Sequence, residues 1–359
     1  MYNDIALEEA ALDSASPRPI CPATQPVLRQ NWYVVAFAHE VDAERPLLRY
    51  CCGDRIALFR TAKGEPVALQ DRCPHRGSPL SLGKIAEDTL QCPYHGFRYA
   101  ASGRCVRVPS QAAIVPELAV HSYPVIEKGG FVWLWPGAPE TADPARLPDC
   151  GEFGLDRPGW SAKPYLMIEI KSNFALLFEN LLDTSHISFL HGTALDGGRM
   201  ASSSFKLESE GKTVRLIREL KGDTPTPSNT KQYGLHGVTV FDRRLESIAY
   251  LPNLHIIRNT FTFPDRPGHA PHVRINVMPI TPSRPNAHYQ FLTMTSSYPE
   301  THPAELIEGM RVVLEEDRVV LEAIQALYDE AGPDLPEWSV NADVAGLRAR
   351  RKLAELASA

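Results

Sequence analysis

The 359-residue sequence has no long hydrophobic run and no excess of positive charge. No apolar segment approaches the roughly 18 residues that a membrane-spanning helix requires. A formal net charge of −6 argues against a nucleic-acid-binding surface, which is normally basic. The first residues are acidic and lack the basic start and apolar core of a signal peptide. We therefore expect a cytoplasmic protein that contacts neither membrane nor nucleic acid.

Cysteine is scarce and odd in number, with seven residues that include the adjacent pair Cys51 and Cys52. This is not the even set of a secreted disulfide framework, and it favours reduced thiols. Two cysteines stand out, because Cys73 and Cys92 each precede a proline and, shortly afterwards, a histidine.

Composition divides the chain into three parts. Residues 1–30 are mixed and proline-punctuated, which indicates a loose arm. From about residue 31, short β-branched and aromatic runs alternate with Gly, Asp and Pro, which predicts a β-rich domain. A segment rich in Pro, Gly and Asp at 136–159 is typical of a connector. We expect one domain at 31–150 and a second at 151–359.

The second domain mixes helices and strands. A helix is predicted over 173–192 and another over 305–331, from their apolar periodicity and terminal residues. Short alternating runs predict strands between them. The expected strands are a hairpin at 202–220 and single strands at 233–241, 254–263, 272–280 and 288–297.

Two segments of the first domain, CPHRG at 73–77 and CPYHG at 92–96, each carry one cysteine and one histidine. A Cys2His2 zinc site uses the same donors, although zinc fingers keep their cysteines and histidines in separate pairs. One cysteine and one histidine on each loop suits a binuclear iron–sulfur cluster, with thiolates on one iron and imidazoles on the other. The candidate ligands are Cys73, His75, Cys92 and His95.

The apolar segment 173–192 contains polar residues that are costly to bury without partners: Asn180, Asp183, His186 and His191. The two histidines are not spaced for one helix face, so the helix must bulge or end if they converge. Satisfied core polar residues are one interpretation. Two imidazoles and a carboxylate from another element are also the ligand set of a non-haem Fe(II) oxygenase. On the helix at 305–331 the apolar face includes Asp317, our predicted third ligand, with Glu316 as the alternative.

Together, CPHRG, CPYHGFRY and ENLLDTSHISFLH (179–191), followed by an acidic pair on a late helix, resemble the Rieske non-haem iron oxygenases across nearly the whole chain. The resemblance is to terminal oxygenase (alpha) subunits, most closely the vanillate and dicamba O-demethylase group. It implies an α+β fold, with an N-terminal all-β Rieske domain followed by a helix-grip (START-like) antiparallel-sheet catalytic domain. It also implies a [2Fe–2S] cluster, a mononuclear Fe(II) and a homotrimer.

By the same resemblance, electrons from NAD(P)H reach the cluster through a ferredoxin and/or a flavin-dependent reductase. They cross between subunits through Asp183, which would bridge His95 of the partner subunit to His186, with Asn180 as a second catalytic residue. The implied reaction uses O2 to monooxygenate a small aromatic or cyclic substrate by O-demethylation or hydroxylation. Ring cis-dihydroxylation and N-demethylation are alternatives on the same scaffold. A pure Rieske electron carrier would leave the second motif unexplained, and a metal-free binding module would need a missing ligand.

Three finer expectations remain. Phe97 stands where respiratory Rieske proteins carry a serine that bonds to a cluster sulfide, which implies a lower reduction potential. Arginines near the cluster loops form a candidate docking patch for an acidic partner or are ordinary surface charge: Arg76, Arg98, Arg104 and Arg107. Residues on strands beyond 200 are candidates to line the substrate pocket: Asn253, His255, Arg258 and Met278.

Overall fold

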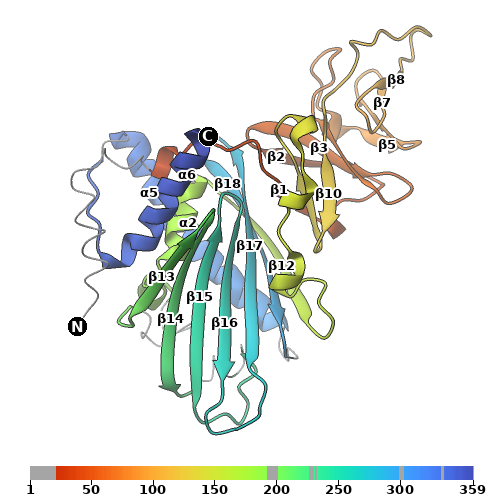
Figure 1. Ribbon diagram of the computed structural model, residues 1–359. Helices are drawn as coiled ribbons and strands as arrows, with labels where there is room; N and C mark the ends of the chain where they lie inside the picture. The colour runs from red at the N-terminus through yellow and green to blue at the C-terminus, as the bar shows by residue number, and fades with distance from the viewer. Residues whose placement is uncertain are drawn as a thin grey trace. The chain divides into compact units, whose positions relative to one another are not determined.

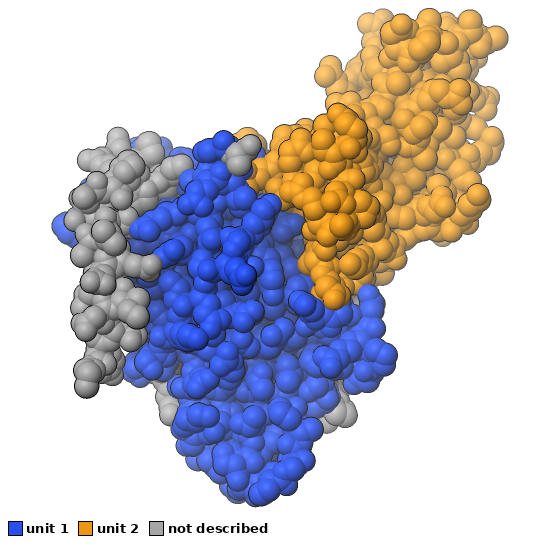
Figure 2. Space-filling model, viewed as in Figure 1, with its two compact units in different colours: residues 1–27, 151–280, 286–359 blue, residues 28–150, 281–285 orange. Residues whose placement is uncertain are grey.

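The computed structural model describes residues 22–191, 201–225, 230, 233–298, 303–332 and 335–358. The chain forms two compact units, which Figure 2 draws in different colours. One consists of residues 28–150 with 281–285. The other consists of residues 151–280 and 286–359, together with the described residues 22–27.

The first unit is built from three small antiparallel sheets, with strand orders β1-β11-β10, β2-β3-β4-β9 and β5-β6-β7-β8. Its strands are short and rich in β-branched and aromatic residues, which pack into two buried cores. The strands are β1 (Tyr33–Phe37), β2 (Leu47–Cys51), β3 (Asp54–Arg60), β4 (Pro66–Gln70), β5 (Lys84–Ala86), β6 (Thr89–Gln91), β7 (Arg98–Tyr99), β8 (Cys105–Arg107), β9 (Ser122–Tyr123), β10 (Val125–Lys128) and β11 (Phe131–Leu134).

The second unit is a seven-stranded antiparallel sheet of order β12-β18-β17-β16-β15-β14-β13. Helices α2 (Phe174–Leu182), α5 (Pro303–Ala331) and α6 (Val344–Ser358) lie against this sheet, as Figure 1 shows. The strands are β12 (Ser161–Ile170), β13 (Phe205–Glu210), β14 (Thr213–Asp223), β15 (Phe241–Tyr250), β16 (Leu254–Thr262), β17 (His272–Arg284) and β18 (Ala287–Ser296). The predicted α+β fold class is therefore confirmed, with a β-rich unit preceding an antiparallel sheet covered by helices.

Two predicted elements differ from the structure. The helix expected over 173–192 ends at Leu182, and a separate turn of helix, α3 (Ile187–Leu190), follows. The strand expected at 233–241 is wrong, because Gly234 and Gly237 have positive φ angles of 62° and 69° that interrupt an extended chain. The strand in this region is β15, whose charged residues concealed its alternation in the sequence. No helix in the described part of the chain is long and apolar enough to cross a membrane.

Candidate metal centres and their cavity

Two loops of the first unit fold in the same way. In the loop after β4, the Cys73 N–H donates to the Ser78 carbonyl (2.8 Å) and the Gly77 N–H to the Cys73 carbonyl (2.9 Å). Between β6 and β7, the Cys92 N–H donates to the Phe97 carbonyl (2.8 Å) and the Gly96 N–H to the Cys92 carbonyl (3.1 Å). Both glycines have a φ of 73°, which a side chain would strain. Each cysteine is therefore held at the start of a tight turn.

The four candidate ligands divide between core and surface. Cys73 and Cys92 are each 1% exposed, whereas His75 and His95 are exposed, with ring centroids 4.5 Å apart. Burial raises the pKa of the Cys73 thiol, and the neighbouring Cys92 sulfur adds to the rise. Two buried thiols and two surface imidazoles are the donor set that would hold a Rieske [2Fe–2S] cluster.

Two aromatic side chains contact this donor set. The Tyr99 hydroxyl lies 3.1 Å from the Cys73 sulfur, and the Phe97 ring stacks on the His75 imidazole at 4.7 Å and 5°. Burial and the Cys73 sulfur both raise the pKa of Tyr99, so its hydroxyl stays protonated and can donate toward sulfur. Phe97 packs on the His75 ring, whereas a serine at this position would offer a hydroxyl to a cluster sulfide. The Phe97 side chain therefore restrains His75 without adding a hydrogen-bond donor.

In the second unit, three donor side chains converge. His186 follows the end of α2, His191 ends α3, and Asp317 lies on α5. One ligand atom from each lies within 4.8 Å of the others. The Asp317 Oδ1 is 3.7 Å from the His186 Nε2 and 3.4 Å from the His191 Nε2. Because α2 stops before His186, two histidines five positions apart can face the same point.

The other nitrogen of each imidazole already has a partner. The His186 Nδ1 contacts the Asp183 carbonyl, and the His191 Nδ1 lies 2.8 Å from the Glu316 Oε2. Such acceptors hold the proton on Nδ1 and leave the Nε2 lone pair for a metal ion. Burial opposes protonation of His191, but Asp317 and Glu316 outweigh it and raise the pKa of His191. Two imidazoles that each have a free Nε2 lone pair when neutral, together with a buried carboxylate, fit a mononuclear iron site.

Asn180 and Asp183 lie beside this centre in different roles. The Asn180 Nδ2 donates to the Asp317 Oδ1 at 3.2 Å, so its amide orients the candidate carboxylate ligand. Asp183 caps α2, and its Oδ1 accepts the Ser185 N–H at 2.9 Å. Asp317 itself is 3% exposed, whereas Glu316 is partly exposed and contacts His191 at Nδ1, on the side of the ring away from Asp317. Between the two predicted acids, the geometry favours Asp317.

A cavity opens beside the three donors, between the sheet and the helices. Its empty volume is about 780 Å³, open solvent at its mouth included. His186, His191 and Asp317 line it together with apolar side chains such as Leu245, Ile257 and Leu292. A metal centre in the wall of a largely apolar pocket can act on a small ring-sized molecule.

Comparison with known proteins identifies this arrangement. The vanillate O-demethylase oxygenase C-terminal domain family matches residues 170–359, and the Rieske [2Fe–2S] domain family matches residues 31–124. The chain belongs to the Rieske oxygenases. Its role is that of the terminal oxygenase component of a multicomponent monooxygenase system, and its cofactors are a Rieske [2Fe–2S] cluster and a non-haem iron.

Individual relatives cover most of this oxygenase. It is 31% identical to the iron-sulfur subunit of the toluene-4-sulfonate monooxygenase system of Comamonas testosteroni, over 91% of this chain and 95% of that protein. It is 29% identical to the dicamba O-demethylase oxygenase component of Stenotrophomonas maltophilia, over 92% and 97%. The crystal structure of dicamba monooxygenase bound to 3,6-dichlorosalicylic acid superposes with a TM-score of 0.84 at 26% identity, covering 93% of this chain and 98% of that one.

Three of the four pocket residues predicted for this oxygenase lie elsewhere, and only Met278 is among the cavity-lining residues. Asn253 lies in the turn between β15 and β16, where its N–H donates to the Tyr250 carbonyl. His255 is fully buried deeper in the sheet, with its Nε2 2.8 Å from the Ser247 hydroxyl. The prediction for these positions needs correction: Asn253 precedes the strand, and His255 shares the parity of Ile257 and Asn259 but packs against Ser247 and Phe178.

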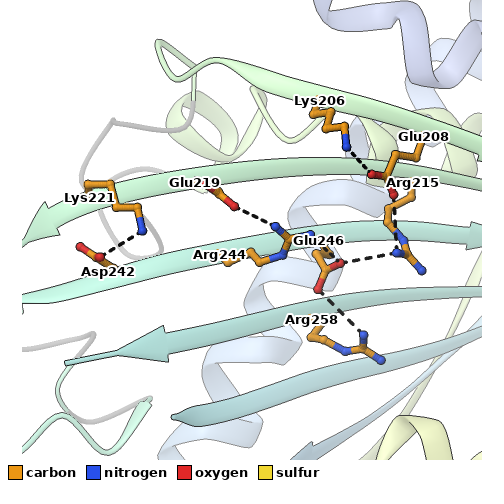
Figure 3. A network of polar contacts seen from close by, with 9 residues as sticks. All are labelled: Lys206, Glu208, Arg215, Glu219, Lys221, Asp242, Arg244, Glu246 and Arg258. Atoms are coloured by element: carbon orange, nitrogen blue, oxygen red, sulfur yellow. Dashed lines mark hydrogen bonds and ion pairs between the residues drawn. The ribbon is translucent and has the colours of Figure 1, made fainter. Parts of the chain in front are cut away.

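Arg258 lies on the opposite face of the sheet. Ile257 and Asn259 line the cavity, and the residue between them must point the other way. Arg258 instead pairs with Glu246 at 3.9 Å, in the ion network of β13 to β16 that Figure 3 shows. The polar pocket residues that sequence analysis missed are Tyr233, Arg243, Asn259, Arg274, Asn276 and Gln290. The alternating pattern of β15 to β18 indicated that every second side chain faces the cavity. The sequence did not indicate which of the two alternating sets that is.

The candidate docking arginines are not equivalent. Arg76, Arg104 and Arg107 are exposed. Arg98 is partly buried and already pairs with Glu87 at 3.0 Å and with the Gln91 side chain at 3.1 Å. A patch that presents charge to a partner would therefore rely on the three exposed arginines.

Proposed function

We propose that this Rieske oxygenase monooxygenates a small aromatic or cyclic substrate, by O-demethylation or hydroxylation of a substituent. The convergence of His186, His191 and Asp317 in the wall of an apolar cavity carries the proposal. The relatives that act on dicamba, vanillate and toluene-4-sulfonate support a substituted arene. Ring cis-dihydroxylation and N-demethylation remain alternatives on the same scaffold.

We assign the cluster to Cys73, His75, Cys92 and His95 within a functional domain at 31–150. We assign the iron to His186, His191 and Asp317 within a catalytic domain at 151–359. Bound iron would supply O2 activation from a site with open coordination positions. The protein itself orients both imidazoles through their Nδ1 atoms, restrains Asp317 through Asn180 and surrounds the substrate with apolar side chains.

The electron route is a further part of the proposal. A ferredoxin and/or a flavin-dependent reductase, fed by NAD(P)H, would reduce the cluster. Because His75 and His95 are exposed, the imidazole edge of the cluster loops can face another protein. In a homotrimer, Asp183 would connect His95 of the partner subunit to His186. A cytoplasmic location of the protein stays a prediction.

The test is turnover with a generic reductase and ferredoxin, using a panel of methoxybenzoates and related arenes. We expect substrate-dependent O2 uptake with formaldehyde release, and about three irons per chain, against about two for a pure electron carrier and none for a binding module. An intact cluster with two irons and no product from any substrate would contradict the proposal.

Asp317→Asn provides the matched variant. It removes the buried anionic ligand but keeps the volume and the contact with Asn180. We expect iron to fall by about one per chain while the visible spectrum of the cluster is unchanged, because only the mononuclear site loses its carboxylate. Glu315→Gln is the control, since Glu315 lies on the same helix but pairs with Arg318 at the surface.

A further inference from the structure

We propose that the substrate carries an anionic group, a carboxylate or a sulfonate, which Arg243 binds inside the cavity that Arg274 also lines. The inference rests on the proposed function, since it concerns the substrate of that same site. Both arginines line the cavity that His186, His191 and Asp317 also line. Arg243 is 7% exposed and Arg274 is 2% exposed.

Buried arginine side chains normally face a carboxylate, because an uncompensated buried charge is costly. The Arg243 Nε donates to the Asn259 Oδ1 at 2.9 Å, and its guanidinium lies over the rings of Tyr233 and Phe261 at 5.6 and 5.8 Å. These partners are neutral, and no carboxylate of the described residues forms an ion pair with Arg243. An anion in the cavity would compensate its charge.

Both guanidinium groups contact the Tyr233 ring. Arg274 also lies over the Tyr233 ring, at 5.4 Å, so one aromatic side chain contacts both cations. The strands explain this arrangement. Arg274 pairs with Asn259 in the β16–β17 register, and Asn259 in turn bonds to Arg243 from β15. The Asn259 side chain thus holds the Arg243 guanidinium in the wall of the cavity, where an anion can reach it.

On the opposite face of the same sheet, the arginines have acidic partners. There, Arg215, Arg244 and Arg258 each pair with glutamates, as Figure 3 shows. This strand system therefore supplies acidic partners to its outward arginines. On the cavity face Arg243 has an amide and two rings instead, which is the arrangement of a binding site for an external anion.

The rest of the cavity suits an arene. Leu245, Ile257 and Leu292 offer apolar contact for a ring. The amide oxygens of Asn276 and Gln290 accept no hydrogen bond from the described residues, so they can hold a hydroxyl or another polar substituent. An aromatic acid with a further polar ring substituent would contact the arginine, the apolar side chains and the two amides of the cavity wall.

The first experiment measures binding without turnover. Titration calorimetry on the full chain would compare 4-methoxybenzoate and benzenesulfonate with the neutral 4-methoxybenzamide. We expect both anions to bind at least about tenfold more tightly than the amide. Arg243→Gln should remove that preference and Arg243→Lys should retain part of it, while Arg258→Gln on the outer face should leave it unchanged. Circular dichroism and the cluster spectrum check that each variant is folded.

The outcomes separate the two proposals. If the anions bind through Arg243 but no compound in the panel yields product, the proposed reaction fails and the anion site stands. If product forms and the neutral amide binds or reacts as well as the anions, the anion site is wrong. Failure of both anions to bind at millimolar concentration, or an equal effect of Arg243→Gln on the anions and the amide, would also overturn it.

Discussion

At the scale of single residues, the two candidate cysteine ligands of the cluster differ in the atoms that contact their sulfurs. Cys73 and Cys92 have the same turn geometry, but Cys73 also has the Tyr99 hydroxyl 3.1 Å from its sulfur. A donor to a thiolate favours the reduced, more negative cluster. Phe97 adds no such donor, so a cluster held by Cys73 would be tuned at this sulfur by the Tyr99 hydroxyl.

Replacing Tyr99 with Phe should therefore lower the reduction potential of the cluster. One hydrogen bond to a charged group, of order 1 kcal/mol net, corresponds to roughly 50 mV for a one-electron couple. Redox titration followed by visible absorption measures the shift. Tyr94→Phe is the control, since Tyr94 is 67% exposed and contacts the His95 ring rather than a sulfur. An unchanged potential in Tyr99→Phe would show that the hydroxyl does not donate to the cysteine.

At the scale of elements, α6 is attached to α2 through one buried cation. The Arg350 Nε and Nη2 both lie 2.6 Å from the Glu179 carboxylate, and the Nη1 lies 2.7 Å from Glu337. Burial raises the pKa of Glu179, against the effect of Arg350. Since Asn180 follows Glu179 on α2, this ion pair also supports the segment that leads to the candidate iron site.

Arg350→Met should loosen the C-terminal helix. It leaves the mostly buried Glu179 without its cation, and the free energy of unfolding should fall by about 2–3 kcal/mol. Hydrogen exchange should accelerate in 344–358 before it does in the central strands. The double variant Arg350→Met with Glu179→Leu should recover much of the loss, because the carboxylate that still loses its cation, Glu337, is exposed to solvent. Equal stability of the single variant and the unmodified chain would contradict this account.

At the scale of the whole molecule, the sheet encloses two histidines in neutral form. His255 on β16 and His288 on β18 are both fully buried, and burial lowers the pKa of His255 to about 3 and that of His288 to about 4. Unfolded histidine titrates near 6.5. Between these values the unfolded chain binds more protons than the folded one, so stability must fall as the pH drops below about 6.5.

At pH 5 each buried histidine should cost roughly 2 kcal/mol of stability relative to neutral pH. His255→Gln, which can keep the contact with Ser247, should remove about half of this acid sensitivity. Melting temperatures between pH 7.5 and 5 measure the effect. His236→Gln, at an exposed histidine of the same unit, should keep the original pH slope. A slope unchanged by His255→Gln would show that other groups govern acid unfolding.

The proposed electron transfer between subunits also belongs to this scale. Asp183→Asn keeps an oxygen that can accept the Ser185 N–H, so α2 and both metal centres should remain intact. The cluster spectrum and the iron content should be unchanged, while product formation should fall by at least about a hundredfold because the bridging charge is lost. Single-turnover assays with pre-reduced protein measure the product formed per chain. Comparable activity in the variant would refute the bridge.

The ligand candidates and the fold class could be predicted from the sequence, because metal centres require particular donors at restricted spacings and strands require alternating side chains. The sequence also indicated that the helix must bulge or end for His186 and His191 to converge, and in the structure α2 ends at Leu182, before His186. The convergence of Asp317 with those histidines follows from the packing of α5, which places Leu314, Asp317 and Leu321 inward and leaves Val320 exposed.

The substrate pocket depended on the tertiary structure alone. On a strand, neighbouring residues point to opposite faces, so a parity error of one position moves a side chain from the cavity to solvent. Arg258 was predicted inside and lies outside, whereas Arg243 and Arg274 lie inside. Local sequence determined which residues can bind metal and which segments form strands, but only the pairing of distant strands decided which charges face the cavity.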